Sequence, residues 1–466
     1  TAWDDDLDDL FKKERRRIEA LQAVCHETDK KVIFCTGELT LEMVKEPFYI
    51  RILNSRDQCI YSDLPGKSYE KDHLGRIYHY SFLDSEKDHF YGFGETTGNL
   101  DKKGLRIRLA PKDALGHDPE YGQPLYMNIP FYIKINENTN YASGFFYNNT
   151  FDCVFDMGNE IGGYLDRYYY YQTDGGDIDL FFINGPSVEN VLKHYTFLTG
   201  RIPLPPKYSL GYIASTMYYT ELDRDCDKKI LDVIDQYIEK EIWVDNFQLA
   251  SGYSSGEKDD LRYVFNWNKN RFPEPLNFIQ EMLSRGINVI PNLKPGILKE
   301  HPYMDVFVKH NAFIKTFDGK EDYIGRWWGG PGKFLDFTNP GGRAAWKELL
   351  KKTILEKGIT TVWNDNCEYD GIDDRNALCC FEGKGANMAQ LKSVQANMMA
   401  YCGQEALEEV YPNLRPYQIN RAGFAGIQRY SQVWGGDNMT DWRTLRFNIY
   451  EIMGMGLSGL ANTGCD

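Results

Sequence analysis

The chain has 466 residues, a length that predicts two domains, at least one of them with a large core. Hydrophobic residues make up 42% and charged residues 26%, a globular balance that disfavours bulk disorder. The formal net charge of -15 disfavours a nucleic-acid partner, because a phosphate-binding groove needs clustered Lys and Arg, and it favours a neutral ligand.

Membrane attachment is not expected either. The sequence has no uninterrupted apolar stretch near the roughly 18 residues of a membrane span, and Thr1 opens no signal-peptide pattern. The ten cysteines lack a paired CxxC arrangement, and the adjacent Cys379 and Cys380 are a poor framework for disulfides, which favours reduced thiols. This pattern predicts a cytoplasmic protein; secretion is the alternative, because a leader could have been removed.

The first two hundred residues change character at residue 31. Residues 1–30 combine an acidic run with FKKERRRIEALQAV, whose spacing predicts a surface helix or an N-terminal extension. Residues 31–200 contain short β-prone runs separated by Gly, Asn and Asp turns, which is typical of an all-β sandwich domain. These runs are KVIFCT, PFYIRIL, RIYHYSFL, PFYIKI, GFFYN and DIDLFFI.

Three prolines in RIPLPPKYSLG mark a domain boundary at residue 201. Residues 201–466 alternate helical stretches with seven candidate strands: YSLGYIAST, IWVDNFQLA, INVIPNL, TTVWND, YQINRAG, SQVWGGDN and GLSGLANTG. This alternation predicts a (β/α)8 TIM barrel that is incomplete at the eighth strand. We therefore interpret the chain as part of a longer protein, and a second polypeptide that supplies the remainder is one expected partner.

Two aspartates close predicted barrel strands. Asp365 ends TTVWND on the fourth strand, and Asp437 ends SQVWGGDN on the sixth. Active sites of TIM barrels lie at the C-terminal ends of the strands, and glycosidic cleavage needs one carboxyl group to protonate the leaving oxygen and another on the opposite face. Taken alone, an Asp after a strand is more often a helix cap or a turn residue.

Longer motifs surround both aspartates. WNDNCE spans 363–368 and RAGFAGIQRYSQVWGGDN spans 421–438, while YGFGE, PLYMNIPFYI, FLDFTNP and the final GCD are further landmarks. Together these motifs resemble glycoside hydrolase family 31, the α-glucosidase and α-xylosidase family, over most of the chain. Trp363, Asp365 and Glu368 match the W-x-D-M-N-E segment of that family, whereas Asn366 and Cys367 depart from it.

The resemblance implies that Asp365 is the nucleophile, Asp437 the general acid/base and Arg421 a ligand of the sugar hydroxyls. Further candidates for substrate binding are Trp363, Glu368, Trp434, Asp466, Trp327 and Asp118. Packing is an equal alternative for Trp327 and its neighbour Trp328. An ordinary turn aspartate is the favoured alternative for Asp118.

The second strand departs from the family pattern. Family members commonly carry D-I-D after this strand, but this chain reads QLASGY, so Ala250 and Gly252 replace both acids, and Asp245 is expected to be a core-facing turn residue. Without these two acids, the sequence does not determine which sugar and which linkage the protein prefers. Lys294, which closes the third strand in NLKPG, is a weaker supporting candidate for the site, and a solvated lysine is its alternative. The histidines and cysteines show no zinc spacing and the glycine-rich stretches fit no nucleotide loop, so we expect no metal and no cofactor.

These observations predict a retaining α-glycosidase that hydrolyses α-linked gluco-oligosaccharides by double displacement through a covalent glycosyl-enzyme. In such an enzyme the two carboxyl groups lie roughly 5 to 5.5 Å apart. Two alternatives stay open. One is an α-transglucosylase that uses the same carboxylates with a sugar acceptor, and the other is an inactive carbohydrate-binding protein that kept the scaffold.

Overall fold

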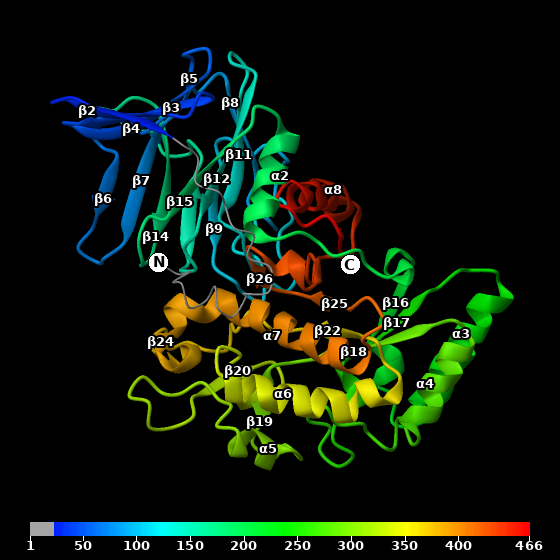
Figure 1. Ribbon diagram of the computed structural model, residues 1–466. Helices are drawn as coiled ribbons and strands as arrows, with labels where there is room; N and C mark the ends of the chain where they lie inside the picture. The colour runs from blue at the N-terminus through cyan, green and yellow to red at the C-terminus, as the bar shows by residue number, and fades with distance from the viewer. Residues whose placement is uncertain (1–22) are drawn as a thin grey trace. The chain divides into compact units, whose positions relative to one another are not determined.

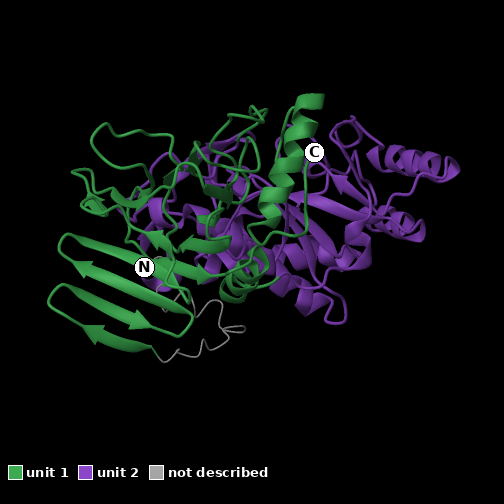
Figure 2. Cartoon of the chain, turned by 90° about the horizontal axis from the view of Figure 1, so that it is seen from above, with its two compact units in different colours: residues 1–110, 114–201, 435–466 green, residues 111–113, 202–434 purple. Residues whose placement is uncertain are grey.

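The computed structural model describes residues 23–466, and the chain divides into two compact units (Figure 2). Of the described residues, unit 1 holds 23–110, 114–201 and 435–466, and unit 2 holds 111–113 and 202–434. The sequence predicts a helix or extension for residues 1–30. Residues 1–22 of that range lie outside the described part of the chain, and Val24–Glu27 form a strand, β1. The domain ranges 31–200 and 201–466 stay predictions; the chain passes from unit 1 to unit 2 after Arg201.

Unit 1 is built on antiparallel sheets, as expected for the β-sandwich (Figure 1). The first sheet contains, in order, β1, β2 (Lys31–Cys35), β3 (Leu39–Lys45), β4 (Phe48–Asn54) and β5 (Cys59–Ser62). The second contains β15 (Leu180–Asn184), β12 (Tyr141–Tyr147), β11 (Phe131–Asn136) and β8 (Asp88–Gly92). The third contains β6 (Tyr69–Lys71), β7 (Ile77–Phe82), β14 (Tyr168–Thr173), β13 (Cys153–Asp156) and β9 (Arg106–Leu109).

Aromatic rings fill the core of unit 1. Tyr132 of β11 stacks on Phe145 of β12, with ring centroids 4.9 Å apart, and on Phe93 at 5.3 Å. Helix α2 (Val188–Thr199) lies against β12, and its Tyr195 stacks on Phe131. Because each buried ring removes about 150 to 250 Å² from water, these contacts account for much of the aromatic excess in the composition.

Unit 2 is an α/β unit. Its main sheet contains, in order, the parallel strands β16 (Ile213–Thr216), β17 (Asn246–Leu249), β18 (Asn288–Leu293), β22 (Thr361–Asn364), β25 (Tyr417–Asn420) and β27 (Gln432–Trp434). The helices between them are α3 (Cys226–Glu239), α4 (Pro275–Ser284), α5 (Met304–Lys309), α6 (Pro340–Thr353) and α7 (Met388–Val410). These strands are six of the seven predicted for the barrel. Among residues 23–466, no helix is both long enough and apolar enough to cross a membrane.

Smaller elements complete both units. A three-stranded antiparallel sheet of unit 2 contains β19 (Gly296–Leu298), β21 (Gly330–Phe334) and β20 (Ile324–Trp327). The short strands are β10 (Met127–Asn128), β23 (Leu378–Cys379), β24 (Ala386–Asn387), β26 (Gly423–Phe424) and β28 (Thr463–Gly464). Strand β28 falls on the seventh predicted strand, and the carbonyl of Gly464 accepts a hydrogen bond from the N–H of Gly435, the residue that follows β27.

Several helices begin at a capping side chain. Asn387 accepts from the N–H of Gln390 at the start of α7, and Asn339 caps α6, whose first residue is Pro340. In unit 1, Asp441 caps α8 (Trp442–Gly456). Each cap satisfies an N–H that has no partner within the helix, which is why Asn and Asp mark these positions.

The parallel register aligns the ends of three central strands of unit 2. Leu293 of β18 pairs with Asn364 of β22, and Asn364 pairs with Asn420 of β25. Most side chains of these strands are buried, as expected for parallel strands that are covered on both faces. The residues that follow the three strand ends therefore lie together at one edge of the sheet.

We expect Trp346→Ala to lower the stability of unit 2 strongly. Trp346 of α6 is 0% exposed and its ring meets Phe265 and Phe337 edge-on, at 4.6 and 5.2 Å. Removing a buried Trp costs about 3 to 5 kcal/mol, whereas an exposed substitution usually changes stability by less than about 0.5 kcal/mol. Urea unfolding followed by circular dichroism, with Trp243→Ala at an 87% exposed position as the control, measures the difference. Equal midpoints for the two variants would contradict this account of the core.

Candidate active site

Lys294, Asp365 and Arg421 directly follow the aligned ends of β18, β22 and β25. All three side chains are buried, with Asp365 6% and Arg421 2% exposed. The sheet register thus brings two cations and one carboxylate from distant parts of the chain to the same place. The position of Asp365 at the C-terminal end of a parallel strand is the one predicted from the sequence.

Both carboxylate oxygens of Asp365 are engaged. Lys294 Nζ donates to Oδ2, and Asn292 Nδ2 donates to the same atom over 2.9 Å. The N–H of Asn366 donates to Oδ1 over 2.8 Å, and Arg421 Nε lies 3.2 Å from Oδ1. Hydrogen bonds from charged donors are the strong ones, so these contacts fix the carboxylate in place.

Arg421 is shared among three carboxyl groups. Its Nη2 lies 2.5 Å from Glu368 Oε1 and 3.2 Å from Asp113 Oδ2, in addition to the contact between its Nε and Asp365. Asp113 is tied to the same site by Asn366, whose Nδ2 donates to Asp113 Oδ2 over 3.1 Å. The structure therefore brings the predicted residues Asp365, Glu368 and Arg421 together in one buried network.

Burial and charge act in opposite directions on these groups. Burial alone would raise the pKa of Asp365, but the charges of Lys294 and Arg421 hold that pKa well below its usual range. Burial raises the pKa of Glu368 in spite of the neighbouring Arg421. Asp365 is therefore ionised at neutral pH, as a nucleophilic carboxylate must be.

An exposed tryptophan stands beside this carboxylate. Trp328 Nε1 donates to Asn366 Oδ1 over 3.0 Å, and Lys294 Nζ lies 5.2 Å from the centre of the Trp328 ring. The residue is nevertheless 52% exposed. Its neighbour Trp327 is buried and meets Trp328 edge-on at 5.9 Å. Substrate contact by Trp327 stays a prediction, and it is Trp328 that offers an open ring.

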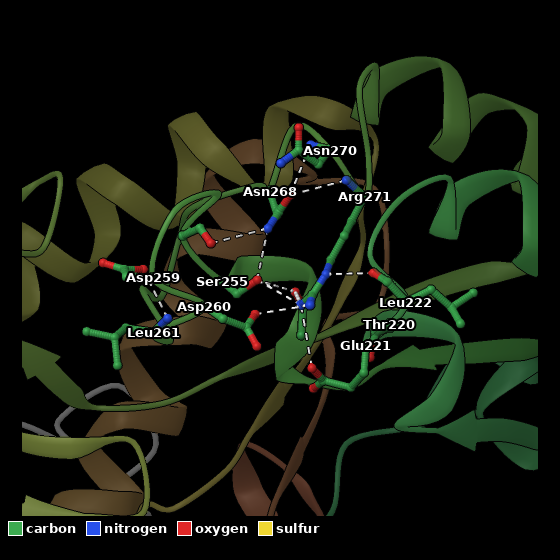
Figure 3. Close-up of polar contacts among 12 residues, drawn as sticks. Thr220, Glu221, Leu222, Ser255, Asp259, Asp260, Leu261, Asn268, Asn270 and Arg271 are labelled. Atoms are coloured by element: carbon green, nitrogen blue, oxygen red, sulfur yellow. Dashed lines mark hydrogen bonds and ion pairs between the residues drawn. The ribbon is translucent and has the colours of Figure 1, made fainter.

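The loop after β17 is anchored by Arg271 (Figure 3). Arg271 Nη1 donates to the carbonyl of Gly252 over 2.9 Å and to Ser255 Oγ over 2.8 Å, and its Nε donates to the carbonyl of Leu222 over 2.9 Å. Asp260 forms an ion pair with the same guanidinium, with its Oδ1 3.0 Å from Arg271 Nη2. This buried cation joins the loops that follow β16 and β17.

Glu221, on the loop after β16, occupies the space beside Gly252. A β-carbon at residue 252 would lie 2.7 Å from Glu221 Oε1, so a larger residue there would require the loop to move. Both oxygens of Glu221 accept from Arg262 Nη2 over 2.6 Å, and the Arg262 guanidinium lies 5.5 Å from the Trp328 ring. QLASGY lacks the two acids of the family pattern, and the carboxylate of Glu221, on the neighbouring loop, lies beside Gly252. Asp245 is half-buried.

Asp437 belongs to unit 1, where its backbone is fixed on both sides. Its carbonyl accepts from the N–H of Gly116 over 2.8 Å, and its own N–H donates to the hydroxyl of Tyr126 over 3.2 Å. Gly436 has a φ of 59°, and a β-carbon there would lie 2.0 Å from the Tyr126 ring, so this position requires glycine. The Asp437 side chain is half-buried. Its role and its spacing from Asp365 stay predictions.

The other predicted residues have varied surroundings. Trp363 and Trp434 meet edge-on at 5.6 Å within an apolar cluster of unit 2. In unit 1, Asp118 accepts from the N–H groups of Glu120 and Tyr121, as a turn aspartate does, and pairs with Arg443 over 2.8 Å. Arg443 lowers the pKa of Asp118 to about 2. Asp466 is exposed. Substrate contact by these residues stays a prediction.

Sequence reasoning gave little weight to one member of the network and missed another. Lys294 was only a weaker candidate, and its solvated alternative is wrong, because the side chain is buried against Asp365. Its signal was its place at the end of an apolar strand, the same place that singled out Asp365. Asp113 is far from the other residues in the sequence and follows no strand of the barrel, so no pattern pointed to it.

Comparison with known proteins identifies the family. The model of the glycosyl hydrolases family 31 TIM-barrel domain matches residues 202–466, and that of the glycosyl hydrolase 31 N-terminal galactose mutarotase-like domain matches residues 3–156. The chain belongs to glycoside hydrolase family 31. The resemblance read from the motifs around Asp365 and Asp437 is therefore confirmed, together with the predicted fold class of a TIM barrel preceded by a β-sandwich domain.

This family 31 chain is similar to curated α-glucosidases. It is 32% identical to α-glucosidase 2 of Bacillus thermoamyloliquefaciens over 457 residues, which are 96% of this chain and 55% of that protein. It is 28% identical to the α-glucosidase of Saccharolobus solfataricus over 406 residues, which are 82% of this chain and 56% of that protein. The chain spans about half the length of these relatives.

Solved family 31 structures share the fold. A mutant of a dextranase from Flavobacterium johnsoniae, complexed with isomaltotriose, superposes with a TM-score of 0.85 at 24% identity, over 95% of this chain and 53% of the dextranase chain. A glucosidase II α subunit gives a TM-score of 0.82 at 20% identity, over 95% of this chain and 53% of that chain. These likenesses establish the architecture.

We expect Arg421→Met to destabilise the protein more at pH 8 than at pH 5. The change leaves Asp365 and Glu368 buried without their shared cation, and breaking a buried ion pair costs about 3 to 5 kcal/mol. Burial already raises the pKa of Glu368 above its unfolded value, so its protonated form stabilises the fold at low pH, and this contribution is lost as the pH rises through the folded-state pKa. Without Arg421, the stability that is lost between pH 5 and pH 8 becomes larger.

Urea midpoints at both pH values measure this effect, with Arg415→Met at an exposed position as the control. If the variant lost the same stability at pH 5 and at pH 8, the protonation of Glu368 would not depend on Arg421.

Proposed function

We propose that the protein is a retaining hydrolase of α-linked glucosides. The observation that carries the proposal is the buried Asp365 carboxylate, which Lys294 and Arg421 keep ionised at the C-terminal end of a parallel strand. A nucleophilic carboxylate needs this state, and TIM-barrel enzymes place it at this end of the sheet. The relatives named α-glucosidase support the substrate class.

The reaction has two steps that use the same two aspartates. First, an oxygen of Asp365 attacks the anomeric carbon while the bond from that carbon to the leaving oxygen breaks, and Asp437 gives its proton to that oxygen. Second, the oxygen of a water molecule attacks the same carbon, Asp437 takes a proton from the water, and Asp365 leaves as a carboxylate. Each step inverts the anomeric centre, so the product retains the starting configuration.

The exposed ring of Trp328 supports a sugar as the ligand. Pyranose rings present apolar C–H faces that lie well against a tryptophan. The hydrogen bond from Trp328 Nε1 to Asn366 fixes the ring next to the proposed nucleophile. Sugar and linkage preference stay open, and a cytoplasmic location stays a prediction from the cysteine pattern.

We expect Asp365→Asn to reduce kcat on an aryl α-glucoside by at least about 10³-fold, because the nucleophile is lost. Asp437→Ala should lose roughly 10²- to 10⁴-fold on substrates with poor leaving groups and far less on dinitrophenyl glucosides, which need no proton. Steady-state kinetics over a series of leaving groups measures both effects. The control is Asp232→Asn, the same change at an exposed position on α3. Full activity in Asp365→Asn would refute the nucleophile assignment.

The first sugar released should be the α-anomer. Proton NMR of the anomeric signals during the first minutes of hydrolysis, before mutarotation, distinguishes α- from β-glucose. A β-anomer as the first product would rule out double displacement. In the same experiments, longer oligosaccharides formed from maltose, nigerose or isomaltose would identify the transglucosylase alternative.

A further inference from the structure

We propose that Lys294 controls the breakdown of the glycosyl-enzyme, by favouring Asp365 as a free carboxylate over Asp365 as a glycosyl ester. The inference rests on the proposed function and adds to it a residue that sets the relative rates of the two steps. It derives from the contacts of Lys294 within unit 2.

Lys294 is held close to the proposed nucleophile. Its side chain is 6% exposed, and Nζ donates to Asp365 Oδ2 and, over 2.5 Å, to Asn366 Oδ1. The strands that carry the two residues are hydrogen-bonded at this point, since the N–H of Asp365 donates to the carbonyl of Leu293 over 2.8 Å. The ammonium group is therefore attached to the same rigid edge of the sheet as the carboxylate.

The two cations of the site differ in what they neutralise. The charge of Arg421 is divided among Asp365, Glu368 and Asp113. Lys294 forms its ion pair with Asp365. Burial lowers the pKa of Lys294, and the charge of Asp365 opposes that shift, so the cation at residue 294 depends on the ionised carboxylate.

Formation of the ester removes this counter-charge. When an oxygen of Asp365 bonds to the anomeric carbon, the carboxylate becomes neutral, and Lys294 remains a buried cation beside the Asn366 amide oxygen and the Trp328 ring. A buried charge without its counterion is costly, and these neutral partners offset part of that cost. The free energy of the ester is thus raised relative to that of the carboxylate.

The second step reverses this loss. Water attacks the anomeric carbon, the bond from that carbon to the Asp365 oxygen breaks, its electron pair returns to Asp365, and the proton of the water goes to Asp437. A carboxylate beside an ammonium group is less basic, so it is a weaker nucleophile in the first step and a better leaving group in the second. Lys294 therefore shifts the balance of rates towards rapid release of the sugar.

Pre-steady-state kinetics with dinitrophenyl α-glucoside tests the proposal. Wild type should release dinitrophenol with a small burst or none, whereas Lys294→Met should show a burst that approaches one equivalent per active site. The ratio of the deglycosylation rate constant to the glycosylation rate constant should fall roughly tenfold or more, the factor that corresponds to one pKa unit of carboxylate basicity. Lys294→Arg keeps the charge and should keep the ratio near that of wild type.

Controls separate charge from packing. Lys333→Met removes a lysine that pairs with Asp322 outside the network and should leave the ratio unchanged. If Lys294→Met fails to fold, Lys294→Gln provides the same test, because it removes the charge and keeps a hydrogen-bond donor. Two outcomes would overturn the proposal. One is an unchanged ratio of the two rate constants in whichever neutral variant folds. The other is a fall of that ratio in Lys294→Arg as large as in the neutral variant.

Trapping distinguishes failure of this inference from failure of the proposed function. A fluorinated α-glucosyl donor that slows hydrolysis of the ester should label Asp365 of the wild type, detectable by peptide mass spectrometry. Absence of any labelled Asp365 would refute the double-displacement mechanism itself. Labelled Asp365 combined with a rate ratio that does not respond to residue 294 would refute the role of Lys294 alone.

Discussion

The site depends on one buried carboxylate that stays ionised between two cations. Taking Asp365 out of water is unfavourable, and Lys294 and Arg421 reverse the effect of burial on its pKa. The three residues come from three strands whose parallel register ends at the same level. A slip of one residue in that register would turn each side chain to the opposite face of the sheet, so the chemistry depends on strand pairing.

Charge sharing extends this constraint beyond the strand ends. Arg421 also contacts Glu368 and Asp113, and Asn366 links Asp113 to Trp328 through its amide group. An exposed aromatic ring and the buried Asp365 carboxylate are therefore held by one set of hydrogen bonds. Buried polar groups of this kind are costly when a partner is missing, which explains why so many donors converge on so few oxygens.

The loops around the sheet show how one family scaffold accommodates a change. Ala250 and Gly252 follow β17 at the positions where the family pattern predicts acids, and Glu221 of the neighbouring loop lies against Gly252. Arg271 and Arg262 neutralise that carboxylate and connect it to the surroundings of Trp328. Loops on a rigid sheet can exchange such residues, because the register that places Asp365 lies in the strands and not in the loops.

The sequence by itself determined the family, the alternation of strands and helices, and the place of Asp365 at the end of a strand, because hydrophobic periodicity and the long motifs are local signals. Tertiary structure decided the partners of Asp365. From the sequence, Lys294 was a weak candidate for which a solvated lysine was the alternative, and strand pairing is what buries it; Asp113 carried no local signal at all. Which charges surround a carboxylate depends on contacts between residues far apart in the chain, and one sequence specifies such contacts only through the folded sheet.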